Sequence, residues 1–254
     1  MKSAEMPADR TTCQPPPIGR VPAIDLARTT ALVAMAGFHL GVDLELFGLL
    51  APGTTRMGAW PLAARAIAAS FLFLAGVSLW LAHGQGIRWR AFLRRLGVLM
   101  LAAGAVSLGT WAVMPQQFVY FGILHSIAAA SVIGLAFLRL PAGVTLAAAA
   151  LVLWLPGVAR SPAFDSPWLW WTGLSTWTRP SMDFEPVLPW LAPALAGLAC
   201  ARLAARHGVW PAIARAGAGW PAWLGWPGRH SLAVYLLHQP VLLAGVALVA
   251  LIAS

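Results

Sequence analysis

The chain has 254 residues, of which 59% are hydrophobic and only 10% are charged, and its mean hydropathy is +0.74. An average soluble domain carries about 25% charged residues, so this composition excludes an ordinary soluble enzyme, a disordered chain and a disulfide-rich scaffold. The net charge of +9 would suggest a nucleic acid partner for a soluble protein. Here the basic residues lie mostly between apolar runs, as in membrane proteins. We therefore expect a lipid bilayer as a partner and no nucleic acid.

Two residue types exclude further classes of protein. Cys13 and Cys200 are too few and too far apart to suggest a disulfide framework or a metal site, so we expect free thiols and no bound metal. Lys2 is the only lysine. A retinal-type Schiff base needs a lysine inside the helix bundle, which excludes a seven-helix photoreceptor.

Residues 1–20 are polar and contain three consecutive prolines, which predicts a disordered cytoplasmic tail without a cleavable signal peptide. Residues 21–254 are expected to form a single transmembrane domain. Its fold class is all-α, a polytopic membrane bundle of about seven transmembrane helices. The seven apolar runs are Ile24–Leu50, Trp60–Ala82, Ala91–Val113, Phe118–Leu138, Ala142–Val158, Pro186–Ala205 and Ser231–Ile252.

The segment Val209–Gly228 is rich in tryptophan and proline. This composition predicts an interfacial or re-entrant element, and an eighth span is the alternative.

Loops on one side hold most of the arginines, while Arg56, Arg160 and Arg179 lie on the other. The positive-inside rule then places the N-terminus in the cytoplasm and the C-terminus outside. We expect the membrane to be a bacterial inner membrane. The arginine-rich loops carry Arg88, Arg90, Arg94, Arg95, Arg139, Arg202, Arg206, Arg215 and Arg229.

The first apolar run carries the largest set of ionisable residues. Asp25, Arg28, His39 and Asp43 fall on one helical stripe about 60° wide, which must face the protein interior or a wet cavity. Asp43 is expected to orient His39 as a general base. Asp25 and Arg28 are expected to pair and to meet an anionic ligand. The alternatives are a capping role for Asp25, a position of Asp43 outside the membrane and a structural role for His39.

Other spans contain further candidate residues. His238 shares a stripe with Tyr235 and lies near the middle of the last span, either as a site residue or as a partner for the backbone broken by Pro240. His125 lies at a depth similar to that of His39. Asp183 and Glu185 lie shortly before Trp190. They either cap the following helix or provide a carboxylate at the outer mouth.

Several segments together resemble one family, the catalytic domain of heparan-alpha-glucosaminide N-acetyltransferase, within a wider superfamily of transmembrane acyltransferases. The resemblance covers nearly the whole chain. It is carried by Arg20-Val-Pro-Ala-Ile-Asp25-Leu-Ala-Arg28 through Phe38-His39, Phe71-Leu-Phe-Leu-Ala-Gly76, Phe121-Gly-Ile-Leu-His125, Asp183-Phe-Glu-Pro186 through Trp190, and Gly228-Arg-His-Ser231 through His238-Gln-Pro240.

The resemblance implies a membrane-embedded acyltransferase without a bound cofactor. It would move an acetyl or other acyl group from cytosolic acyl-CoA, such as acetyl-CoA, to an amine or hydroxyl of a sugar-like acceptor. His39 corresponds to the histidine of the family's first helix. We expect the arginines to contact the donor's phosphates, while the acceptor enters near Asp43 and Asp183. The arginines concerned are Arg28, Arg94, Arg95 and Arg229.

Two mechanisms stay open, because His39 either deprotonates the acceptor or carries the acyl group itself. A homodimer is one option for assembly. The alternative function is a small-solute or proton-coupled transporter, since buried histidine and aspartate also serve proton relays. A third interpretation is a membrane scaffold without catalytic activity. A transporter would ignore acyl-CoA in detergent and would require a sealed vesicle.

Overall fold

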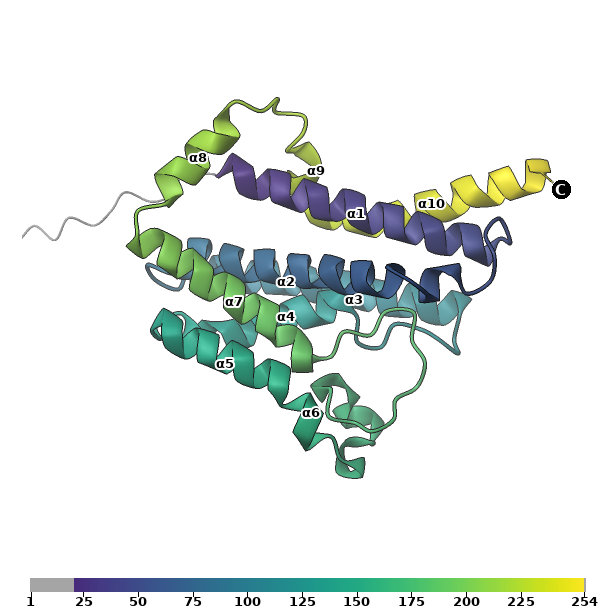
Figure 1. The fold of residues 1–254 in the computed structure, drawn as a ribbon, viewed down its shortest axis with the longest axis horizontal. Coiled ribbons are helices and arrows are strands. Elements are labelled where there is room, and N and C mark those ends of the chain that lie inside the picture. Colours follow the sequence, from purple (N-terminus) through teal and green to yellow (C-terminus); the bar gives the residue numbers. More distant parts are fainter. Residues whose placement is uncertain (1–20, 254) are drawn as a thin grey trace, which may run out of the picture.

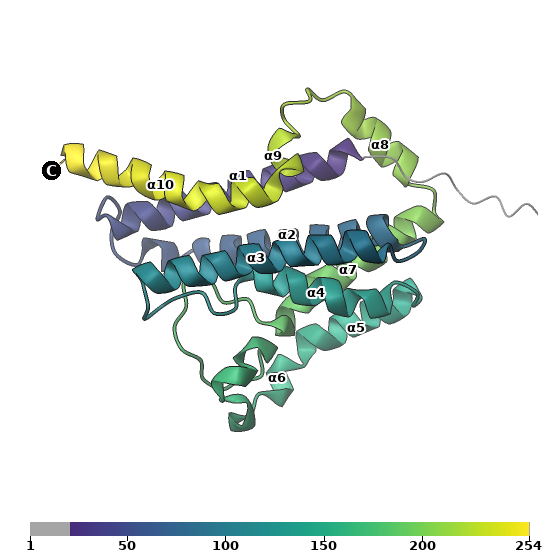
Figure 2. The same cartoon turned by 180° about the vertical axis from the view of Figure 1, so that it is seen from behind.

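The computed structural model describes residues 21–253, so the expected tail of residues 1–20, with Cys13, lies outside the described part. The described chain is helical, and its elements are drawn in Figures 1 and 2. In chain order they are α1 (Pro22–Leu46), η1 (Thr54–Arg56), α2 (Trp60–His83), α3 (Trp89–Val113), α4 (Ile123–Phe137), α5 (Ala142–Trp154), α6 (Pro156–Ala159), η2 (Pro162–Phe164), η3 (Pro167–Thr172), α7 (Val187–Arg206), α8 (Trp210–Ala218), α9 (Trp226–Arg229) and α10 (Ser231–Ala253).

The axes of the long helices are roughly aligned, and the helices stack in layers. Helices α1 and α10 lie side by side on one face, α2 and α3 form the middle, and α4, α7 and α5 lie beyond them (Figures 1 and 2). The end of the bundle where α1 begins also holds α8, α9 and the start of α3, and we call it the basic end. The loop of residues 160–186, with η2 and η3, lies at the opposite end, which we call the loop end.

Five helical segments are long and apolar enough to cross a membrane within the described residues. The expected all-helical, multi-pass fold is therefore confirmed, but the count of seven is not. Helix α1 is long enough, with 25 residues, but carries several charged groups, and α4 has only 15 residues. The five spanning segments are Trp60–His83, Trp89–Val113, Ala142–Ala159, Val187–Arg206 and Ser231–Ile252.

Helix α4 begins at Ile123 rather than at the predicted Phe118. Gly122 before it is extended, and Phe121 pairs with the segment that precedes α7. The backbone N–H of Glu185 donates to the carbonyl of Phe121 at 3.0 Å, and Phe121 and Phe184 form an isolated bridge. This pairing uses the backbone groups that a longer helix would have needed, so the helix cannot extend towards Phe118.

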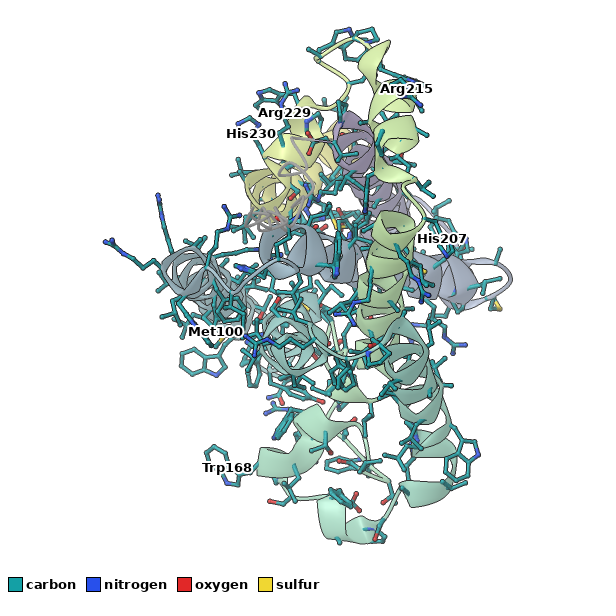
Figure 3. The ribbon with its side chains drawn as sticks, turned by 90° about the vertical axis from the view of Figure 1, so that its left-hand side faces the viewer. Met100, Trp168, His207, Arg215, Arg229 and His230 are labelled. Atoms are coloured by element: carbon teal, nitrogen blue, oxygen red, sulfur yellow. The ribbon has the colours of Figure 1, made fainter. Side chains whose placement is uncertain are left out.

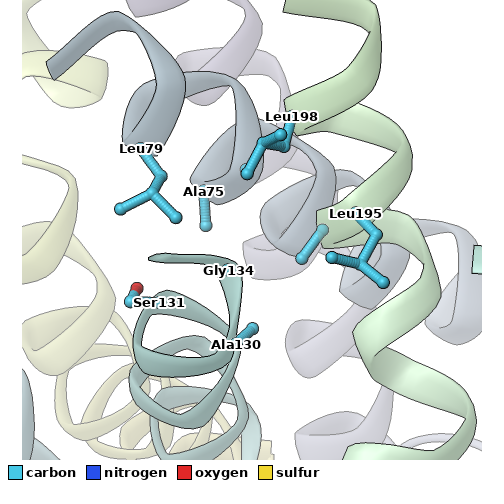
Figure 4. Close-up of a pocket in the computed structure, with 9 residues that line it drawn as sticks. Ala75, Leu79, Ala130, Ser131, Gly134, Leu195 and Leu198 are labelled. Carbon is cyan, nitrogen blue, oxygen red and sulfur yellow. The ribbon is translucent and has the colours of Figure 1, made fainter. Parts of the chain in front are cut away.

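Helices α2 and α7 approach each other closely because small residues face each other. A Cβ atom at Gly76 would overlap the carbonyl oxygen of Ala194, and one at Gly197 would overlap the carbonyl oxygen of Phe73. Small residues allow this approach in membrane proteins, where packing replaces the hydrophobic effect as the driving force. Figure 4 shows the seam between α2, α4 and α7, which is lined by Ala75, Leu79, Ala130, Ser131, Gly134, Leu195 and Leu198.

The segment between α7 and α10 does not form an eighth span, because its longest helix, α8, has only nine residues. Trp210 anchors it to the bundle by stacking on Trp80, while its indole N–H donates to the carbonyl of Ala201 at 3.1 Å. Three further tryptophans of the segment are exposed, namely Trp220, Trp223 and Trp226. Tryptophans at such positions suit the interface between membrane and water.

The close contact of α2 and α7 predicts that Gly76→Val destabilises the fold. The added side chain meets backbone of α7, which cannot yield as a flexible side chain does, so we expect a loss of about 3 kcal/mol or more. Thermal unfolding in detergent measures this loss of stability. Gly104→Val on α3 is the matched control, because a Cβ there meets nothing within 4 Å. Equal melting temperatures for the two variants would contradict this account of the packing.

Candidate active site

Two histidines meet where α1 packs against α10. His39 Nδ1 lies 3.2 Å from His238 Nε2, and the ring centroids are 5.0 Å apart. His39 Nδ1 also lies 3.1 Å from the carbonyl oxygen of Met35, and His238 Nδ1 contacts the carbonyl oxygen of Tyr235. Both histidines are only partly exposed. The two candidates from opposite ends of the sequence therefore form one site.

The hydrogen bonds assign the tautomers of this pair. A carbonyl oxygen can only accept, so His238 carries its hydrogen on Nδ1 and its Nε2 must accept from His39 Nδ1–H. His39 Nε2 is then the nitrogen with the lone pair. A neutral imidazole with one nitrogen fixed as donor and the other left as acceptor is the arrangement that a general base requires.

Asp43 lies one turn further along α1 and pairs with Gln239 rather than with His39. Gln239 Nε2 donates to Asp43 Oδ1 at 2.8 Å, and Asp43 is only 1% exposed. The expected bond from His39 to Asp43 does not form, because side chains on a helix lean towards its N-terminus and His39 therefore reaches Met35 instead. Asp43 is buried among helices and does not lie beyond α1.

Gln239 is a residue that sequence reasoning missed. It follows His238 directly in the chain and precedes Pro240, within the last of the motifs that resemble the family. Two of the oxygens in this contact, Asp43 Oδ2 and Gln239 Oε1, are buried and have no hydrogen-bond partner among the described residues. A glutamine inside an apolar helix was itself a signal of a polar contact.

Asp25 and Arg28 pair near the basic end, as their spacing predicts. Arg28 Nη1 lies 3.3 Å from Asp25 Oδ1, and Arg28 Nη2 donates to Ser78 Oγ of α2 at 2.6 Å. Val21, and not Asp25, occupies the N-cap position of α1. Asp25 lies in the first turn and is 7% exposed. It is therefore a buried partner of an arginine, close to the positive end of the helix dipole.

Two further arginines approach this pair. Arg95 of α3 lies within electrostatic range of Arg28, and Arg229 lines a cavity of about 50 Å³ together with Asp25. Figure 3 looks onto the basic end and shows Arg229 and His230 near each other, with Arg215 on the neighbouring α8. Arg94 is exposed and does not join the group. The cavity has room for a few water molecules and for nothing as large as a nucleotide.

The remaining candidates lie towards the loop end. Asp183 Oδ2 accepts from the backbone N–H of Ile123 at 2.9 Å, so it caps α4 instead of the helix that follows it in sequence. His125 Nδ1 accepts from the backbone N–H of Gly122 at 3.2 Å, and its ring stacks near Phe121. His125 thus supports the start of α4 and does not contact His39. Trp190 packs against the apolar core around α2, α4 and α7.

Asp183 and Glu185 form a pair of partly buried carboxyl groups just before α7. Burial raises the pKa of Asp183 to about 6, against the opposing effect of the Ile123 hydrogen bond. Burial, and then the proximity of Asp183, raise the pKa of Glu185 to about 9. Tyr235 of α10 lies within electrostatic range of both groups. The raised pKa of Glu185 depends on contacts between distant segments, so the sequence could not indicate it.

These carboxyl groups predict a stability that falls as the pH rises. Between about pH 4.5 and pH 9 the folded chain keeps a proton on Glu185 that the unfolded chain has released, so each pH unit costs at most about 1.4 kcal/mol. We expect the melting temperature in detergent to fall over this range, and Glu185→Gln to flatten the fall. Asp165→Asn is the control, because hydrogen bonds from Thr176 lower the pKa of that exposed carboxyl. A wild-type melting temperature that rises with pH would contradict the assignment.

A family model matches most of the chain. The profile described as "Heparan-alpha-glucosaminide N-acetyltransferase, catalytic" matches residues 20–240. No curated protein and no solved structure matches the chain significantly. The matched range contains every candidate residue from Asp25 to Gln239, and it confirms the resemblance seen in the sequence motifs. With most of its length matched, the chain belongs to the catalytic family of heparan-alpha-glucosaminide N-acetyltransferase, a family of membrane acetyltransferases.

Proposed function

We propose that this protein transfers an acetyl or other acyl group from acyl-CoA to an amine or hydroxyl of a sugar-like acceptor, in a bacterial inner membrane. The observation that carries the proposal is the contact of His39 with His238 between two helices. In this member of an acetyltransferase family, the contact leaves the lone pair of His39 on Nε2.

The chemistry follows from this tautomer. His39 Nε2 takes the proton of the acceptor's hydroxyl or amine as that atom attacks the carbonyl carbon of the thioester. The carbon–sulfur bond then breaks, and the proton passes to the leaving thiolate as free CoA. While His39 is charged, its Nδ1–H bond to His238 Nε2 becomes charge-assisted and therefore stronger. His238 is thus a positioning residue that stabilises the imidazolium.

The arginines suit the donor's phosphates. Arg28 precedes His39 by eleven residues on one helix, which corresponds to about 16 Å along the axis. A donor held at Arg28 must therefore reach His39 through an extended arm, and CoA has such an arm between its phosphates and its thioester. Arg95 and Arg229 add charge at the same end. Access beside Arg229 requires the segment that lines the small cavity, residues 217–225, to move aside.

The acceptor would approach from the loop end. Asp183 and Glu185 lie there, together with exposed aromatic residues such as Trp168 and Trp177. Carboxyl groups beside exposed aromatic rings suit a polar acceptor with hydroxyl or amino groups. With the basic end in the cytoplasm, donor and acceptor would then enter from opposite sides of the membrane and meet near His39.

The test is calorimetric titration of acetyl-CoA into the purified protein, with transfer or slow hydrolysis measured alongside. We expect His39→Ala to bind acetyl-CoA like the wild type but to lose activity by about 100-fold or more, because the general base is gone. His207→Ala is the control, since His207 is exposed at the end of α7.

Two outcomes contradict the proposal. Full activity of His39→Ala would remove this histidine from the mechanism. Failure of the wild type to bind acetyl-CoA and longer acyl-CoAs would remove the donor itself. Uptake assays in sealed vesicles would then test the transporter interpretation.

A further inference from the structure

We infer that Asp43 is held as a neutral carboxylic acid that forms a two-bond clamp with Gln239, and that this clamp sets the distance between His39 and His238. The inference goes beyond the proposed function, because it assigns Asp43 a positioning role and no catalytic charge. It rests on the proposed function only where activity is measured.

The donors and acceptors of the two side chains do not match if Asp43 is charged. Gln239 Nε2 donates to Asp43 Oδ1 at 2.8 Å. Asp43 Oδ2 and Gln239 Oε1 are both buried, and neither has a partner among the described residues. If Asp43 is a carboxylate, both oxygens can only accept hydrogen bonds, so they cannot bond to each other. A proton on Oδ2 makes Asp43 a donor and allows a second bond, from Oδ2–H to Oε1.

The surroundings of the Asp43 carboxyl group favour its neutral form. Asp43 is 1% exposed and lies in the contact between α1 and α10, which it shares with Gln239 and the histidine pair. Its one assigned hydrogen bond comes from a neutral amide, and no arginine or lysine forms a salt bridge with it among the described residues. The titratable group facing it from α10 is His238, whose lone pair already accepts from His39. A buried carboxylate without a cation is unfavourable, so the neutral acid is the stable form.

The clamp lies next to the histidine pair in both helices. Gln239 is the residue next to His238, and Asp43 follows His39 by one helical turn. The clamp therefore lies one turn beyond the 3.2 Å contact of the two rings and joins the same two helices. A carboxylic acid and a carboxamide have the same shape and can both donate from one position. An asparagine at position 43 can replace the neutral acid, whereas it cannot replace a carboxylate.

The experiment compares Asp43→Asn, Asp43→Leu and Gln239→Leu as full-length proteins in detergent. Infrared difference spectra at neutral pH should show the carbonyl band of a protonated carboxyl group in the wild type minus Asp43→Asn. The control is Glu45→Gln, which should not remove this band, because Glu45 accepts hydrogen bonds from Gly53 and Thr55 as a carboxylate. This readout needs no substrate, so it stays valid if the proposed function fails.

Stability and activity add a second readout. Asp43→Asn should keep the melting temperature and the acyl-transfer rate within a few-fold of the wild type. Asp43→Leu and Gln239→Leu should each lower the rate by about 100-fold through misplacement of the histidines. Their double variant should be no worse than either single one, because both remove the same contact.

Three results would overturn the inference. The first is an infrared difference that shows loss of a carboxylate rather than of a protonated acid. The second is an Asp43→Asn variant that fails to fold, because the amide should satisfy the same two bonds. The third is a folded Asp43→Asn variant as inactive as His39→Ala, which would return a charged catalytic role to Asp43.

Discussion

Polar side chains inside an apolar bundle must find their partners within the protein, and the candidate site depends on this constraint. Water is not available in the hydrocarbon region to satisfy them. Arg28 on α1 meets Ser78 on α2, and His39 on the same helix meets His238 on α10. Each contact fixes a helix that apolar packing alone would leave free to slide or rotate. Helix α1, which carries most of these groups, is therefore the element against which the other parts of the site are placed.

The sequence allowed most of the helices, and the polar face of the first one, to be predicted. Apolar runs and helical periodicity are local properties, and they placed the start of α2 at Trp60 and the end of α3 at Val113, as observed. The pair of Asp25 and Arg28 is also local, because residues three apart share a helix face. Helix positions and contacts within one helix can therefore be predicted from the residues of that helix.

Contacts between distant segments were beyond this kind of reasoning. Nothing local indicates that Asp183 caps α4, sixty residues earlier in the chain, or that this cap and the pairing of Phe121 shorten the helix. The partner of Asp43 was wrongly expected on its own helix, although the helix geometry directs His39 away from it. The pKa of Glu185 is raised by burial and, in addition, by the proximity of Asp183. These features depend on which helices are neighbours.

The first turns of α10 connect the two halves of the molecule. Tyr235 lies within electrostatic range of the carboxyl pair Asp183 and Glu185, while His238, three residues later, contacts His39 on α1. The rings of Tyr235 and His238 are themselves only 5.7 Å apart. A single turn of helix therefore stands between the expected acceptor entrance and the candidate base. A small rotation of α10 would change both contacts together, so the polar contacts that fix α10 against α1 also determine how the acceptor side meets the histidine pair.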